Sequence, residues 1–133
     1  MFNWRRPTNL GVNDGRLAPC KRTPNCVSSQ AEPDDGEHYI APIAYRGTMR
    51  ELQQAVQSMP RSTVISADRQ YLYAEFRTPL MRYVDDVELY YDERAGLVQV
   101  RSASRLGRRD FGVNRKRIEE LRSRLRTITR AVP

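Results

Sequence analysis

Residues 101–117, RSASRLGRRDFGVNRKR, decide the fold, because a strand-like run meets a helix-like run there. The four residues before this stretch, 97–100, are mostly apolar and begin the last strand, which continues into Arg101. From about 114 to 129, apolar side chains recur at spacings of three, four and three, which predicts an amphipathic helix. These helix positions are Ile118, Leu121, Leu125 and Ile128.

A second amphipathic helix is predicted upstream, over about 48–59. Thr48 and Glu51 form a capping box, in which each side chain accepts a hydrogen bond from a backbone N–H of the first turn. Apolar residues then recur at 49, 52, 56 and 59, and the helix ends before Pro60. Between the two helices, four runs have the composition or the alternation typical of strands. They span about 63–67, 71–78, 84–91 and 97–101.

This order of elements predicts a single α+β domain, with its folded part over residues 48–133. The sheet is a four-stranded antiparallel meander, and both helices pack on one face because each has one narrow apolar stripe. Residues 1–47 are rich in turn residues and keep no periodicity, so we expect an extended N-terminal arm packed on the domain. The opposite face of the sheet is left for the arm, a partner or a ligand.

Two cysteines, Cys20 and Cys26, lie in the arm. The chain has neither the apolar segment of a secretory signal nor a run long enough to span a bilayer, so we expect a soluble, cytoplasmic protein. Free thiols are the expected state there, with a small-loop disulfide or a metal or redox role as alternatives. The chain has one histidine, His38, and no second set of ligands, so neither a metal nor a cofactor is predicted.

The net charge of +7 is concentrated in one segment. Residues 101–130 carry 11 basic and three acidic side chains, whereas the remainder carries 12 basic and 13 acidic. Of the 23 basic residues 21 are arginines, and the planar guanidinium fork suits carboxylate and phosphate groups. The sequence therefore indicates an anionic partner for this segment or an internal set of ion pairs.

An internal lattice is the structural interpretation of this charge. Asp85 and Asp86 are consecutive in a strand, so their side chains point to opposite faces and cannot form a carboxylate pair for acid–base chemistry. Arg101 and Arg105 share one face of the neighbouring strand in a meander. Cross-strand ion pairs with the aspartates are therefore within reach, and Asp110 can join them.

A binding site is the functional interpretation. A glycine-bounded loop, 107–112, delivers positive charge to a helix start, where the helix dipole disfavours cations and an anion is expected. We therefore expect a module that binds a small anionic ligand or an acidic protein surface. The candidate ligand-binding residues are Arg101, Ser102, Ser104, Arg105, Asp110, Asn114, Arg115 and Arg117.

Two other functions have less support in the sequence. We do not expect nucleic-acid binding, because no aromatic residue interleaves the arginines of the last helix and Glu119 and Glu120 pair with them. No motif assigns a reaction, since Ser102 and Ser104 have only His38 as a base. An unrecognised enzyme, with Asp110 or His38 as proton carrier, is the third hypothesis.

Two blocks of sequence carry a family resemblance. The first is PNCVSS at 24–29, and the second runs from VDDVE at 84–88 through RSASRLG at 101–107 to DFGVNRKRI at 110–118. Together they resemble the domain-of-unknown-function 1499 family of bacterial and plastid proteins. At Arg108 and Arg109 the chain departs from the uncharged, often aromatic pair expected there. The resemblance implies no activity, cofactor or substrate, because the family is uncharacterised.

Overall fold

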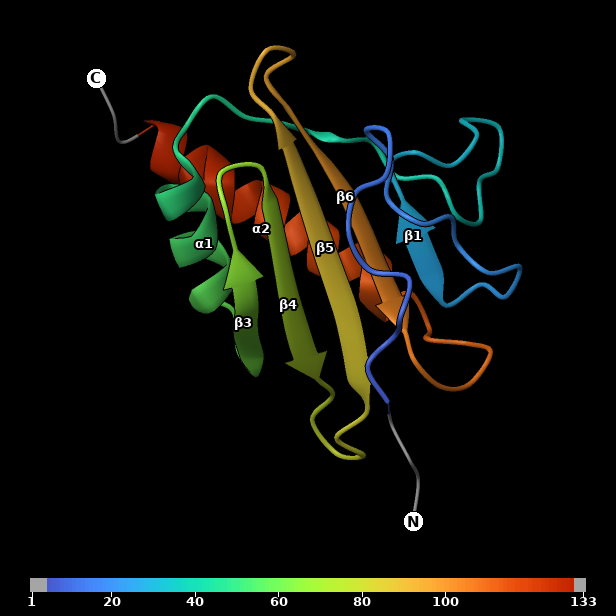
Figure 1. The fold of residues 1–133 in the computed structure, drawn as a ribbon. Coiled ribbons are helices and arrows are strands. Elements are labelled where there is room, and N and C mark those ends of the chain that lie inside the picture. The colour runs from blue at the N-terminus through green and yellow to red at the C-terminus, as the bar shows by residue number, and fades with distance from the viewer. Residues whose placement is uncertain (1–4, 131–133) are drawn as a thin grey trace.

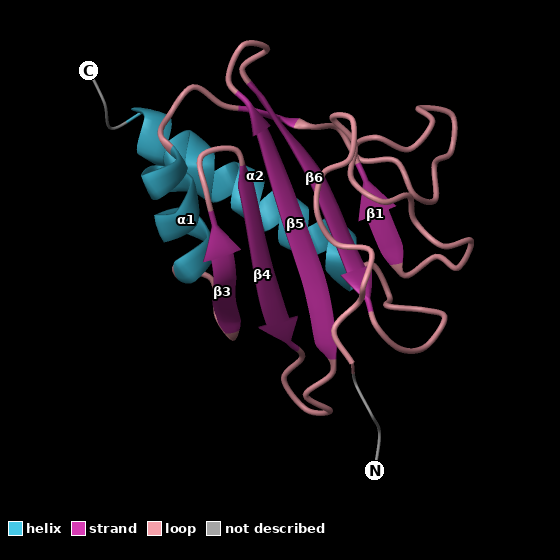
Figure 2. Ribbon diagram, in the orientation of Figure 1, coloured by secondary structure: helices cyan, strands magenta, loops and turns pink. Residues whose placement is uncertain are grey.

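The computed structural model describes residues 5–130, with side chains to residue 128. These residues form an α+β fold, in which one six-stranded antiparallel sheet carries two helices on one of its faces (Figure 1; Figure 2). The elements in chain order are β1 (Cys26–Ser28), β2 (Ile43–Ala44), α1 (Met49–Gln57), β3 (Ser62–Ala67), β4 (Tyr71–Arg77), β5 (Val84–Asp92), β6 (Leu97–Ser104) and α2 (Val113–Arg130). The predicted fold class is confirmed.

The sheet is wider than predicted. Strands β3 to β6 form the expected meander, but β1 and β2 both pair with the outer edge of β6, which gives the order β1-β6-β5-β4-β3 with β2 beside β6. The four-stranded prediction is therefore wrong in strand number. The two additional strands have three and two residues, which is too short for the alternation that identifies a strand in a sequence.

Both helices bury their apolar stripe against the same sheet face. At α1 the capping box is present, because the Thr48 hydroxyl accepts from the Glu51 N–H and the Glu51 carboxylate accepts from the Thr48 N–H, each at 3.1 Å. Leu52 of α1 and Ile118 of α2 are fully buried. The core lies between this helical layer and the apolar face of β4, β5 and β6. The last sheet strand and the start of α2 therefore pack on the same core.

The segment before β1 crosses the opposite face of the sheet (Figure 1). The Gly11 N–H donates to the Glu88 carboxylate at 2.7 Å, and Arg6 donates to Glu75 at 2.8 Å. Leu17 is buried, with 5% of its surface exposed. The arm therefore covers polar side chains of β4 and β5 rather than an apolar surface.

Cys20 and Cys26, both within the predicted arm, form a disulfide that ties the segment before β1 to that strand. The expectation of free thiols is therefore wrong. The chain turns back between the two residues, so their Cα atoms lie 5.6 Å apart, within the range that a disulfide bridges. Disulfides are typical of oxidising compartments, so the pairing weighs against the cytoplasmic location, which stays a prediction. Within residues 5–130, no helix has the length and apolar character needed to cross a membrane.

Candidate functional site

Strands β5 and β6 carry polar side chains on both faces of the sheet. Asp85 pairs with Arg117 of α2 at 2.7 Å, whereas Asp86 pairs with Arg105 on the opposite face at 2.8 Å. The candidate residues therefore divide into two groups. The helix-side cluster consists of Asp85, Ser102, Ser104, Asp110, Asn114 and Arg117. The arm-side cluster consists of Tyr71, Tyr73, Glu75, Asp86, Glu88, Arg101 and Arg105.

Asn114, in the first turn of α2, is the centre of the helix-side cluster. Its side chain is fully buried, and its Oδ1 accepts hydrogen bonds from Ser102 at 2.6 Å and Arg117 at 2.7 Å. Its amide nitrogen lies 2.9 Å from the Ser104 hydroxyl and 2.8 Å from the Asp110 carboxylate. An amide has two donor hydrogens and two acceptor lone pairs, so this side chain is fully satisfied within the protein.

Asp110 occupies the start of α2. Its carboxylate accepts from the Gly112 N–H at 2.9 Å and the Asn114 N–H at 3.2 Å. A carboxylate at a helix N-terminus satisfies unpaired N–H groups and complements the helix dipole. The chain therefore supplies its own anion at the position where the sequence pointed to an external one.

The ion pair between Asp85 and Arg117 links β5 to α2. Asp85 is 2% exposed, and this burial raises the pKa of its carboxyl group, while the charge of Arg117 offsets part of the effect. The Arg117 guanidinium also lies over the Phe76 ring, 4.8 Å from its centre. Both contacts of Arg117 join the helix to the sheet.

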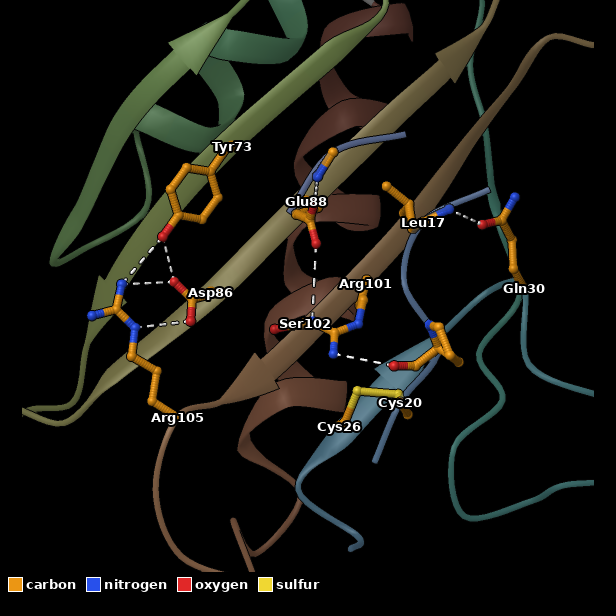
Figure 3. Close-up of polar contacts among 12 residues, drawn as sticks. Leu17, Cys20, Cys26, Gln30, Tyr73, Asp86, Glu88, Arg101, Ser102 and Arg105 are labelled. Carbon is orange, nitrogen blue, oxygen red and sulfur yellow. Dashed lines mark hydrogen bonds and ion pairs between the residues drawn. A yellow bond between two sulfur atoms is a disulfide. The ribbon is translucent and has the colours of Figure 1, made fainter. Parts of the chain in front are cut away.

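On the arm side, Arg105 holds two carboxylates, those of Asp86 and Glu75, and Figure 3 shows its contacts with Asp86 and Tyr73. Its guanidinium donates to both Asp86 oxygens, at 2.9 and 2.8 Å, and to Glu75 at 2.5 Å. The Tyr73 hydroxyl donates to Asp86 by a short hydrogen bond. Burial raises the pKa of Tyr73, so its hydroxyl remains a donor at neutral pH. Two-pronged arginine–carboxylate contacts fix orientation as well as charge.

Glu75 is the strongly acidic group of this cluster. Burial alone raises its pKa, but hydrogen bonds from Arg6 and Arg105, together with the nearby Tyr73 hydroxyl, outweigh that effect and lower the pKa to about 2. Glu75 is therefore ionised over the whole neutral range and balances part of the arginine charge.

Arg101 and Glu88 are less well satisfied. Arg101 is 5% exposed, and Glu88 is fully buried between β4 and β6. The Arg101 Nη1 atom lies 3.9 Å from Glu88 Oε1, too far for a hydrogen bond, and Nη2 donates to the Pro19 carbonyl at 3.3 Å (Figure 3). Among the described residues, neither Arg101 Nε nor Glu88 Oε1 has a hydrogen-bond partner. Burial lowers the pKa of Arg101, which reflects the cost of holding this charge away from water.

A cavity of about 190 Å³ lies beside Arg101. Arm residues cover it, and β5, β6 and the residues after β6 form its floor. Four cationic side chains line it with a single carboxylate, that of Asp86. The four cations are Arg5, Lys21, Arg101 and Arg105. The cavity is therefore rich in positive charge, and one of the arginines that line it has a buried donor without a partner in the described part of the chain.

Two other candidates lie apart from this cavity. Arg115 is directed to the carbonyl groups of Gly36 and Glu37, each at 3.4 Å. Both ring nitrogens of His38 are engaged, one with the Asp35 carboxylate at 2.8 Å and one with the Thr23 carbonyl at 2.9 Å. Among the described residues, no group of three or more His, Cys, Asp or Glu side chains is arranged to hold a metal ion.

Several site residues were not singled out from the sequence. The alternation of apolar and polar residues predicts that one face of β4 and of β5 is exposed to solvent. That face carries Tyr73, Glu75 and Glu88. The signal that could have found Glu88 is the VDDVELYYD run, which places acidic residues on both faces of a strand in the middle of the sheet. Lys21 could not be placed, because it depends on how the arm folds back.

A family model described as a protein of unknown function, DUF1499, matches residues 16–125. The chain belongs to the DUF1499 family. The predicted resemblance is confirmed, and the matched DUF1499 region contains both clusters and Lys21, whereas Arg5 and Arg6 lie before it. No curated protein matches the chain, and no solved structure does.

Proposed function

We propose that this DUF1499 domain binds a small oxyanion, a carboxylate or phosphate group, in the cavity between Arg101 and Arg105 beneath the N-terminal arm. The observation that carries the proposal is the buried Arg101 side chain, which lines the cavity together with three further cations and whose Nε–H has no hydrogen-bond partner among the described residues. A buried charge with an unmade hydrogen bond is costly, and a bound oxyanion supplies both the charge and the acceptor.

The size of the cavity fits this ligand class. Its volume, about 190 Å³, far exceeds the roughly 10–15 Å³ of probe volume that one water requires. Phosphate, sulfate or a small carboxylic acid therefore fits. Asp86, which also lines the cavity, is already held by Arg105 and Tyr73, so its charge is compensated within the protein.

In this proposal the predicted residues have two different roles. Arg101 and Arg105 contact the anion, with Lys21 and Arg5 adding positive charge at the cavity. Ser102, Asn114 and Arg117 are assigned to structural support, because they bond to one another on the other face of the sheet. Asp110 is assigned to capping α2.

A purely structural or protein-interaction role is the second candidate function. The observation that favours it is the Arg105 guanidinium, which donates hydrogen bonds to Asp86 and Glu75 inside the protein. In that case Arg101 is simply a poorly satisfied buried arginine, and anions have no specific effect on stability.

Thermal unfolding with different anions at constant ionic strength separates the two functions. We expect phosphate, sulfate or a small dicarboxylate to raise the melting temperature above its value in chloride, since a ligand at 100 times its Kd stabilises by about 2.7 kcal/mol. Lys21→Ala should weaken this effect, whereas Arg22→Ala should not, because only Lys21 of these two exposed neighbours lines the cavity. Equal effects of all anions, or equal losses in the two variants, would refute the proposal.

A further inference from the structure

The end of the molecule that carries the β4–β5 and β6–α2 loops exposes a patch of large apolar side chains. Of the seven large apolar residues that are exposed in the described part of the chain, six lie in or beside these two loops, and Ile65 is the exception. We call these six residues the apolar end. They are Leu80, Met81, Tyr83, Leu106, Phe111 and Val113. The two loops lie at the same end of the sheet (Figure 1) and together line a groove of about 560 Å³.

The side chains at the tips of these loops protrude. Leu80 is 93% exposed, Phe111 86% and Met81 64%. Phe111 also has a φ of 54°, a conformation that a bulky residue rarely adopts. Packing within the protein does not account for presenting a phenylalanine ring to water in this way. Contiguous exposed apolar surface of this kind marks a site of interaction with a partner or a membrane.

The charges around the apolar end are positive. Arg77 and Arg82 flank one tip, and Arg108 and Arg109 precede the other, all of them exposed. Residues 77–83 contain no acidic side chain. Asp110, in the second loop, already accepts N–H groups at the start of α2. An apolar patch with a basic border is complementary to a surface with an apolar interior and anionic head groups.

We propose that the apolar end docks on the surface of an anionic lipid bilayer, with Leu80, Met81 and Phe111 entering the interface and the flanking arginines contacting lipid phosphates. The two protruding loop tips need no matching shape in a bilayer, whereas a protein partner would need a surface complementary to both. Apolar burial and attraction to anionic lipids add together in interfacial binding of this kind. The β4–β5 loop lies at one end of the sheet, and the β3–β4 and β5–β6 connections lie at the other end. The proposed docking does not depend on the oxyanion cavity.

Sedimentation with lipid vesicles tests the proposal. We expect the full chain to bind vesicles of equal parts phosphatidylcholine and phosphatidylglycerol more tightly than vesicles of phosphatidylcholine alone. Replacing the two apolar tips, Leu80→Ser with Phe111→Ser, should lower the partition constant at least about tenfold, because two apolar side chains no longer leave water. Arg108→Ser with Arg109→Ser should lower it by about thirtyfold at low salt on the anionic vesicles.

The matched control removes the same charge from the far end of the sheet. Arg69 and Arg94 are exposed in the β3–β4 and β5–β6 connections, so Arg69→Ser with Arg94→Ser should leave binding nearly unchanged. Equal losses in the two double-arginine variants would mean that only net charge matters and would overturn the proposal. All variants should keep the melting temperature of the parent, since the replaced side chains are exposed.

A second readout places Phe111 directly. Trp4→Phe first removes the single native tryptophan. In that background, the fluorescence of a tryptophan introduced by Phe111→Trp should shift to the blue on anionic vesicles, whereas that of one introduced by Ile65→Trp should not. Binding to soluble polyanions such as DNA or polyglutamate, with no loss in the Leu80→Ser and Phe111→Ser variant, would contradict a lipid site. Lys21→Ala, and inorganic phosphate exchanged for chloride at constant ionic strength, should both leave vesicle binding unchanged, which separates this proposal from the oxyanion cavity.

Discussion

Replacing Asn114 with alanine should cost this protein a large part of its stability. The side chain is fully buried, and its four hydrogen-bonding positions are all used by Ser102, Ser104, Asp110 and Arg117. At about 1 kcal/mol for each bond lost, the free energy of unfolding should fall by about 4 kcal/mol. Domains of this size are stable by roughly 5–15 kcal/mol, so the loss is easily measured.

Urea unfolding followed by circular dichroism measures this change. Lys116→Ala is the matched control, because Lys116 is exposed two residues further along the same helix and should alter stability by no more than about 0.5 kcal/mol. A loss below about 1 kcal/mol in Asn114→Ala would refute the structural role of the helix-side cluster. The residues of that cluster would then return to the list of candidate ligand contacts.

Three further predictions concern stability. The Glu75 pKa of about 2 lies below the ordinary 4.5, so its contribution is complete above about pH 4.5 and is lost as the pH falls toward 2. Glu75→Gln should therefore flatten the acid limb of a plot of melting temperature against pH, and an unchanged limb would contradict the assignment. Reducing the disulfide between Cys20 and Cys26 should lower the free energy of unfolding by about 2 kcal/mol, as judged from the short loop that it closes. Thr48→Ala should cost about 1 kcal/mol in urea unfolding, because it removes the N-cap of α1, and no loss would contradict the observed capping box.

Sequence periodicity was sufficient to predict the meander and both helices. The apolar positions of α1 and α2 repeat along one stripe, and apolar residues alternate along β4, so each element identifies the face that packs in the apolar core, although the other face of β4 is buried as well. The opposite directions of Asp85 and Asp86 follow from strand geometry alone. By contrast, β1 and β2 are strands because they pair with β6, and segments this short have no alternation of apolar and polar residues that could identify them in the sequence.

The candidate site was only partly predictable for a related reason. Arg101 and Arg105 could be assigned to one face of β6 from the sequence. The register between β5 and β6, however, places Arg101 beside Glu88, and Asp86 forms its ion pair with Arg105. The cavity also depends on where the arm lies, which brings Lys21 and Arg5 to β6. Such long-range placement follows from tertiary packing and has no local signal in the sequence. The same holds for Phe111, whose exposure depends on the loop that carries it.

A crystal structure with selenate, collected at the selenium edge, tests the central claim most directly. Selenate is an oxyanion with a strong anomalous signal, so its position can be found without reference to the protein map. We expect one strong anomalous peak in the cavity, with an oxygen within hydrogen-bond distance of the Arg101 guanidinium. A cavity that holds only water, while selenate binds elsewhere or nowhere, would contradict the proposed oxyanion site.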